Sequence, residues 1–310
     1  MSIHRTNLYN GTFDYSKLEN MLNGHIVLTT SATTSIYLIL KALNITGNVI
    51  IPEYGHPATK NVCYNLGIQT KIVKSNNLLM DCNDAISKID DNTQCIVYIE
   101  NNGFIDSDIF KLRKICTERG IFLLEDSAPS LGQSINSINA GSIGDASVIS
   151  FSNSKIINLG GGGLCSIKDE DLYKKVKKLS KIMDYHDFEQ GTMSNYMPEC
   201  MYQILSEELK ELDNKIQKRK DIFNLYFSEI GKYMYNTDSD KCYNACTLML
   251  NETQMKKLTK VFNNFKIEYR NNVYPGNDII AKKHIDIPFH TDISEKEVKL
   301  VSKLVKNALS

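Results

Sequence analysis

Short apolar runs alternate with helical segments through the first half of the chain, and this alternation limits the possible folds more than any other feature. Each apolar run is roughly four to six residues long and each helical segment roughly ten to thirteen, with short connections between them. The expected strands are residues 48–52, 70–73, 95–99 and 121–124, and the expected helices are residues 58–66, 80–89 and 107–119. This pattern is typical of an α/β protein with a doubly wound, mostly parallel sheet.

The C-terminal third of the chain follows a different pattern. One long amphipathic helix is expected over residues 200–230. Shorter elements follow, namely strands at 247–250 and 266–270 and helices at 252–262 and 295–309. A chain of 310 residues is long enough for a large domain and a smaller one. We therefore expect a large domain over residues 1–218 and a small α+β domain over residues 219–310.

The composition argues against several classes of function. Lysine plus arginine and aspartate plus glutamate both number 36, so the net charge is zero and nothing favours a nucleic acid as partner. No apolar run is long enough to span a bilayer, and the first residues lack the apolar core of a signal peptide. The eight cysteines form no C-x-x-C pair and lie apart from the histidines. We therefore expect no metal site, no membrane partner, and a cytoplasmic protein with reduced thiols.

Two of the apolar runs end close to a residue with useful chemistry. The run 121–124 leads directly into Glu125 and Asp126, and the run 146–151 ends four residues before Lys155. Such a pair suits pyridoxal 5′-phosphate (PLP), because the lysine can form the Schiff base while Asp126 keeps the pyridine nitrogen protonated. Either residue alone is weak evidence, since acids are common at strand ends and most lysines lie on the surface.

Other residues are candidates for the remaining parts of a PLP site. Small, mostly hydroxylated residues at 31–34 open an expected helix and form either a plain N-cap or an anion site. Ser150 and its neighbouring hydroxyls could reach a phosphate. His56 follows the strand 48–52, either as a surface residue or against the cofactor ring. The glycines at 160–163 are read as a turn, and no G-x-G-x-x-G motif supports a nicotinamide enzyme.

The order and content of these motifs resemble the DegT/DnrJ/EryC1/StrS family of PLP-dependent sugar aminotransferases over nearly the whole chain. The matching segments are SATTSIYLIL (31–40), IIPEYGHPAT (50–59), EDSAPSLG (125–132), GSIGDASVISFSNSK (141–155) and IDIPFHTDISEKEVKLV (285–301). The resemblance implies fold type I and a homodimer with active sites shared between subunits.

The resemblance also implies a role for individual residues. Lys155 corresponds to the Schiff-base lysine and Asp126 to the partner of the pyridine nitrogen. The residues that correspond to the phosphate and ring contacts are Ser31, Ala32, Thr33, Ser150 and His56. In the loop that reaches the partner subunit's phosphate, the asparagine corresponds to Asn195 or, without a gap, to Ser194.

Two positions depart from the family's pattern. Pro129 stands where the family has a glutamine that reaches the phenolic oxygen of PLP, and proline cannot donate that hydrogen bond. The arginine of the dimer loop is replaced by Tyr196 or Met197.

The expected function is therefore an aminotransferase with PLP as cofactor. The expected amino donor is glutamate, and the expected acceptor is a keto sugar, specifically a nucleotide-linked keto-deoxysugar for surface polysaccharide or a related glycan. Two alternatives stay open, a keto acceptor without a nucleotide and a non-catalytic PLP-binding protein of the same fold. Lysine at position 155 argues against the related sugar dehydratases, which resemble this family but carry histidine there.

Overall fold

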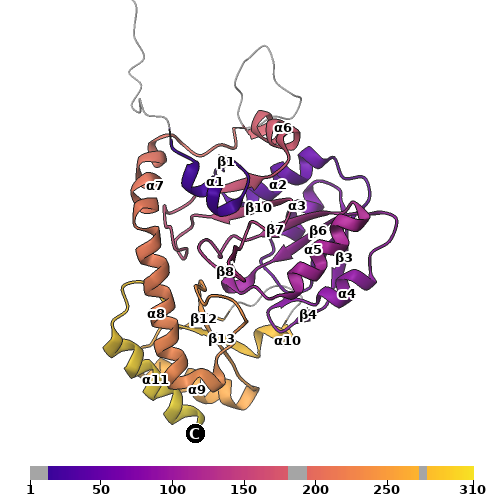
Figure 1. The fold of residues 1–310 in the computed structure, drawn as a ribbon. Coiled ribbons are helices and arrows are strands. Elements are labelled where there is room, and N and C mark those ends of the chain that lie inside the picture. The colour runs from indigo at the N-terminus through magenta and orange to yellow at the C-terminus, as the bar shows by residue number, and fades with distance from the viewer. Residues whose placement is uncertain (1–12, 181–193, 272–277) are drawn as a thin grey trace, which may run out of the picture.

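The computed structural model describes residues 13–180, 194–271 and 278–310, and a seven-stranded sheet lies at its centre (Figure 1). The strands lie in the order β1, β11, β10, β7, β6, β2, β3. Their bounds are β1 His25–Thr29, β2 Asn48–Pro52, β3 Gln69–Val73, β6 Thr93–Ile99, β7 Phe122–Asp126, β10 Ala146–Ser150 and β11 Gly163–Ile167. β11 is antiparallel to both neighbours, whereas every pair from β10 to β3 is parallel. The predicted α/β fold with a mostly parallel sheet is confirmed.

Helices cover both faces of this sheet. One face packs against α2 (Ala32–Leu43), α3 (Ala58–Asn65) and α6 (Glu170–Ser180). The opposite face packs against α4 (Cys82–Ser87) and α5 (Asp108–Arg119). The central strands are therefore buried on both sides, which explains why their sequences read as continuous apolar runs rather than as alternating patterns. A short helix, α1 (Ser16–Leu22), precedes β1 and contacts it.

Some elements differ from those that the sequence predicts. The helix expected at 80–89 is shorter, because Met80 belongs to the short strand β5 (Leu79–Met80) and Asp81 caps α4 by accepting hydrogen bonds from the N–H groups of Asn83 and Asp84. β5 pairs with β4 (Ser75–Asn76), and β8 (Ser134–Ile135) pairs with β9 (Ile138–Asn139). Two-residue strands carry too little periodicity to be read from sequence.

The helix expected at 200–230 is interrupted at Glu211. It consists of α7 (Cys200–Lys210) and α8 (Leu212–Ile230), which follow one another along one side of the molecule (Figure 1). Beyond them lie η2 (Gly231–Tyr233), α9 (Glu252–Phe265), α10 (Asp278–Ala281) and α11 (Glu295–Leu309). The expected strand at 266–270 forms only an isolated bridge between Arg270 and Asp286. The partner of β12 (Cys246–Met249) is instead β13 (His284–Ile287).

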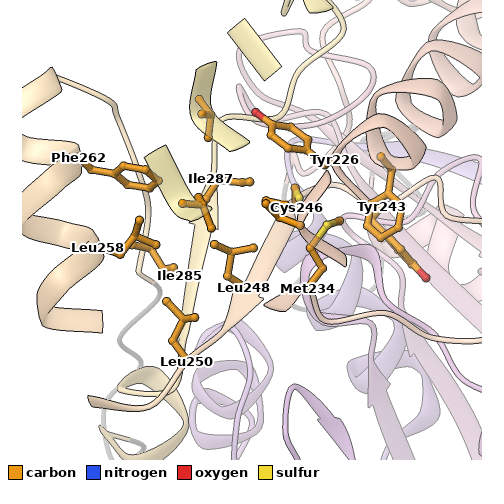
Figure 2. Close-up of a cluster of buried hydrophobic side chains, with 14 of the residues drawn as sticks. Tyr226, Met234, Tyr243, Cys246, Leu248, Leu250, Leu258, Phe262, Ile285 and Ile287 are labelled. Atoms are coloured by element: carbon orange, nitrogen blue, oxygen red, sulfur yellow. The ribbon is translucent and has the colours of Figure 1, made fainter. Parts of the chain in front are cut away.

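A hydrophobic core joins this C-terminal part to the main sheet. Figure 2 shows residues from α8, α9 and the antiparallel pair β12 and β13, which point toward one another. Tyr54 and Phe104, from loops of the main sheet, belong to the same cluster. The Tyr54 hydroxyl also lies 3.0 Å from Nε2 of the buried His284. The division into residues 1–218 and 219–310 stays a prediction, and its boundary falls within α8.

Two further expectations concern membrane-spanning segments and the state of the cysteines. Within the three described segments, no helix is both long and apolar enough to cross a membrane. All eight cysteines are free thiols, and only Cys200 is exposed, so the others act as small apolar residues of the core.

Candidate active site

The carboxyl ends of the parallel strands bring most of the predicted site residues together. Asp126 ends β7, Ser150 ends β10, and His56 follows β2. A cavity of about 430 Å³ opens at this edge of the sheet, where open α/β sheets bind their ligands. The predicted residues that line it are Ser31, Ala32, Thr33, His56, Asp126, Ser150 and Lys155.

Asp126 is a buried carboxylate with weak hydrogen bonds. The Thr59 hydroxyl donates to Oδ2 over 3.3 Å, and the Ala128 N–H donates to Oδ1 over 3.3 Å. Burial raises the pKa of Asp126, while the Ala128 N–H and the charges of His56 and Lys155 oppose that rise. No ion pair with Asp126 is present among the described residues, so a cationic ring nitrogen would supply what this carboxylate lacks.

Lys155 is a partly buried lysine with a lowered pKa. Its pKa is lowered to about 8, chiefly by burial; the charge of Asp126 opposes this shift, and the charges of Arg270 and Arg219 add to it. Its Nζ makes no hydrogen bond or ion pair with any residue that the structure describes. A lysine whose pKa lies near the ambient pH has a substantial fraction of neutral amine, which can act as a nucleophile and a base.

The start of α2 forms one wall of the cavity. Ser31 is the N-cap, and its Oγ accepts a hydrogen bond of 3.1 Å from the Thr34 N–H. The N–H of Thr33 has no partner in the described chain and lies at the positive end of the helix dipole. The first residues of α2 therefore form an N-cap and also offer a site where an anion could bind.

A glycine of β11 allows α2 to begin so close to the sheet. A Cβ at Gly163 would lie 2.5 Å from the Ala32 nitrogen and 2.7 Å from the Ile149 oxygen. The glycine run is thus a turn into β11, as predicted, and its last residue also has a packing role at the cavity wall.

Hydroxyl groups face the same wall from β10. The Oγ atoms of Ser150 and Ser152 lie 3.1 Å apart, and the Ser152 N–H donates to the Ser150 Oγ over 3.3 Å. Both residues line the cavity beside the start of α2. Pro129, where the resemblance places a glutamine, also lines the cavity and offers no side-chain donor.

Asn195 does not line this cavity. Its backbone N–H donates to the Ser180 oxygen over 2.9 Å, and its oxygen accepts from the Thr30 N–H over 3.1 Å. The adjacent Tyr196 forms a bridge to Thr29, so this segment runs along the free edge of β1. The predicted role of Asn195 at the phosphate of a partner subunit stays a prediction.

A second cavity of about 600 Å³ adjoins the first. The two cavities share Ser154, Lys155, Asn244 and Arg270. The sequence analysis missed Asn244 and Arg270, because neither belongs to a recognisable motif. It also missed Thr59, which donates a hydrogen bond to Asp126, and Arg219, which lines the second cavity. Arg219 had a signal, since it occupies an apolar position of the α8 stripe.

Comparisons with known proteins identify the family to which the chain belongs. The model of the DegT/DnrJ/EryC1/StrS aminotransferase family matches residues 12–275. GDP-perosamine synthase of Vibrio cholerae is 24% identical over 91% of this chain and 86% of its own length. The dTDP-4-dehydro-2,3,6-trideoxy-D-glucose 4-aminotransferase of Saccharopolyspora spinosa is 25% identical over 53% of this chain and 43% of its own.

A solved structure shows the same fold. The putative sugar aminotransferase Spr1654 of Streptococcus pneumoniae in its PMP form aligns with a TM-score of 0.84 and 20% identity, over 94% of this chain and 90% of that one. The chain therefore belongs to the DegT/DnrJ/EryC1/StrS aminotransferase family, which confirms the family, the fold and the enzyme class, a PLP-dependent aminotransferase, that the sequence predicts.

Proposed function

We propose that this chain binds PLP in the 430 Å³ cavity and transfers an amino group from glutamate to a keto sugar. The observation that carries the proposal is the convergence of Lys155 and Asp126 on one cavity beside the start of α2. Asp126 comes from β7, Lys155 comes from the loop after β10, and the third part is the start of a helix, so only the fold brings the three together.

The residues present fit PLP. Asp126 offers a buried carboxylate without an ion pair to a protonated pyridine nitrogen. The Thr33 N–H and the hydroxyls of Ser150 and Ser152 offer donors to a phosphate. When bound, PLP supplies an electron sink that stabilises negative charge on the substrate carbon.

The chain's own residues would perform the remaining tasks. Lys155 would hold the cofactor and, once an amino donor displaces it, take the proton from the donor's α-carbon at its Nζ. Its pKa of about 8 leaves a useful fraction of neutral amine at physiological pH. Asp126 would stay ionised opposite the ring nitrogen, and His56, which lines the same cavity, would lie against the cofactor ring.

The acceptor that we propose is a nucleotide-linked keto-deoxysugar, in surface polysaccharide or related glycan biosynthesis. It is supported by the two relatives above, whose names specify a GDP-sugar product and a dTDP-linked sugar substrate. We further propose a cytoplasmic homodimer in which Asn195 reaches the partner's site. An acceptor without a nucleotide and a non-catalytic PLP-binding protein are the alternatives, and the replacement of glutamine by Pro129 is compatible with the latter.

The test is the visible absorption of the purified protein with added PLP, before and after glutamate. The wild type should acquire the yellow band of lysine-bound PLP, and glutamate should bleach it. Lys155→Ala should not acquire this band. The control is Lys168→Ala, because Lys168 is another lysine with a lowered pKa but lies outside the cavity.

The outcomes separate the alternatives. A band that forms but ignores glutamate and other amino donors would favour the non-catalytic protein. Binding and bleaching without any lysine dependence would contradict the assignment of Lys155. With bleaching established, a panel of nucleotide-linked and free keto sugars then identifies the acceptor by the return of the yellow band.

A further inference from the structure

A buried arginine interrupts the apolar face of α8. The buried residues of this helix are Leu212, Arg219, Phe223, Tyr226 and Ile230, which recur at helical spacing. Arg219 thus occupies a position where the pattern calls for an apolar side chain. Only 5% of its surface is exposed. Arginine is rarely buried so completely unless a carboxylate or another anion pairs with it.

The guanidinium of Arg219 has no such partner in the described residues. Its Nη1 donates to the Tyr243 oxygen over 3.2 Å and to the Asn244 Oδ1 over 3.4 Å, both of them neutral acceptors. Its Nε is buried and makes no hydrogen bond. Burial lowers the pKa of Arg219, as expected for a cation whose charge is not matched.

Four acidic residues line the second cavity, namely Glu208, Glu268, Asp286 and Asp292, and none of them forms an ion pair with Arg219 in the described part of the chain. Glu208 pairs with Lys215. Asp286 pairs with Arg270 over 3.1 Å and accepts hydrogen bonds from Asn102 and Thr247. Arg270 is therefore balanced, whereas the positive charge of Arg219 is not.

The position of Arg219 links this charge to the chemistry of Lys155. Arg219 lines the 600 Å³ cavity, and Lys155 lies where that cavity meets the first one. Asn244, which accepts from Arg219, lines both cavities. A ligand that extends from Lys155 into the second cavity would therefore bring its far end toward the guanidinium of Arg219.

We propose that Arg219 is the anion-binding residue of a substrate subsite in the second cavity, where it takes a carboxylate or phosphate group. This inference rests on the proposed function, since it assigns part of the substrate to the space beside Lys155. The shared chemistry is an anionic oxygen that accepts from the guanidinium. It can come from a carboxylate of the amino donor or from the diphosphate of the acceptor, and the experiment distinguishes the two.

The test compares the wild type with Arg219→Gln, Arg219→Lys and Lys220→Gln. Lys220→Gln is the matched control, because it removes one positive charge from the next position of α8 and Lys220 does not line the cavity. Two titrations use the PLP-loaded proteins. One follows the bleaching of the yellow band by glutamate, and the other follows how GDP or inorganic pyrophosphate competes with that bleaching.

A donor subsite predicts that Arg219→Gln raises the apparent Kd for glutamate roughly ten- to a hundredfold, as expected for the loss of a charged hydrogen bond, with inhibition by GDP unchanged. A diphosphate subsite predicts the reverse, namely unchanged glutamate affinity and loss of competition by GDP and pyrophosphate. Arg219→Lys should show a smaller loss in the same titration, and Lys220→Gln should match the wild type.

A second measurement needs no turnover and separates the inference from the proposed function. Succinate and pyrophosphate should each be tested for an increase in the Tm of the wild type, and Arg219→Lys should reduce whichever increase is found. If the wild type takes up no PLP, the proposed function fails, but this measurement still tests Arg219. The proposal would be overturned if a folded Arg219 variant responded to glutamate, succinate, GDP and pyrophosphate as the wild type does. It would also be overturned if none of these anions affected the wild type.

Discussion

Lys155 owes its reactivity to where it is buried rather than to a neighbouring base. Desolvation disfavours its charged form, and the arginines around the second cavity act in the same direction, although Asp126 opposes them. The pKa of Lys155 is thereby brought close to neutral pH, where the side chain can act both as a nucleophile and as a proton acceptor.

The pH dependence of PLP capture follows from this pKa. Only the neutral amine of Lys155 attacks the aldehyde, and its fraction increases as the pH rises. We expect the rate at which the yellow band appears to increase from pH 6 and to level off above about 8. Stopped-flow absorbance at subsaturating PLP measures this profile. A rate that still increases tenfold per pH unit toward 10.5, the ordinary value for lysine, would show that the side chain is solvated.

Two buried carboxyl groups lie behind Asp126, on the other face of the sheet. Glu125 accepts hydrogen bonds from the N–H groups of Gly141, Ile143 and Gly144. Glu100 is fully buried, and neither of its oxygens has a hydrogen-bond partner in the described structure. Burial, and then the charge of Glu125, raise the pKa of Glu100 well above its ordinary value, so Glu100 is the member that keeps its proton.

Glu100→Gln should therefore become more stable relative to the wild type as the pH rises. A carboxyl whose pKa is raised in the folded state stabilises the fold below the unfolded pKa, and that stability is lost as the pH rises toward the folded pKa. We expect the difference in unfolding free energy to grow by up to about 1.4 kcal/mol per pH unit in this window. Urea denaturation at pH 5.5 and 8 measures it. Glu125→Gln should destabilise at both values, and a pH-independent Glu100→Gln would contradict the assignment.

At the scale of elements, the site depends on how closely a helix terminus meets a strand. Ser31 and Gly162 form a bridge, so the chain entering α2 runs beside the chain entering β11. The approach is possible because Gly163 has no side chain at the point of contact with Ala32.

Gly163→Ala should displace the start of α2. Its Cβ would meet backbone atoms at 2.5–2.7 Å, which cannot move aside as a flexible side chain can. We expect a loss of stability of about 1–3 kcal/mol and weaker PLP binding. Gly161→Ala is the matched control, since a Cβ there meets nothing within 4 Å. Thermal unfolding and PLP titration give both quantities, and equal behaviour of the two variants would refute this account of the contact.

At the scale of the whole molecule, one core ties the C-terminal elements to the sheet. Phe104 follows η1 (Asn101–Gly103) and packs edge-on against Tyr235 and at a tilt against Tyr243, with ring centroids 4.7 Å and 4.3 Å apart. Asn102 donates from the same turn to Asp286 of β13 over 2.9 Å. Large apolar burial across such a junction makes independent unfolding of the two parts costly.

We therefore expect the chain to unfold in one transition, with the PLP band and the far-ultraviolet circular dichroism changing together. Phe104→Ala should shift both transitions equally, by about 3–5 kcal/mol, because it leaves a cavity at the junction. Phe265→Ala is a suitable control, since Phe265 is 60% exposed. Two separate midpoints in denaturant would instead establish two independently stable domains.

The sequence by itself determined the parallel strands of the sheet and most of the helices between them, and it indicated Asp126, Lys155 and the start of α2. These features depend on local periodicity, capping and position at strand ends, all of which are determined by residues that are close together in the sequence. It failed at the two-residue strands and at the interruption of the helix near Glu211, where such signals are short or absent.

Only the tertiary structure decided which distant residues share the site. Arg219, Asn244 and Arg270 come from different elements, and each lines the second cavity through packing that no local pattern encodes. The lowered pKa of Lys155 and the unpaired charge of Arg219 have the same origin. Both follow from removing a cation from water, and burial is set by contacts between residues far apart in the chain.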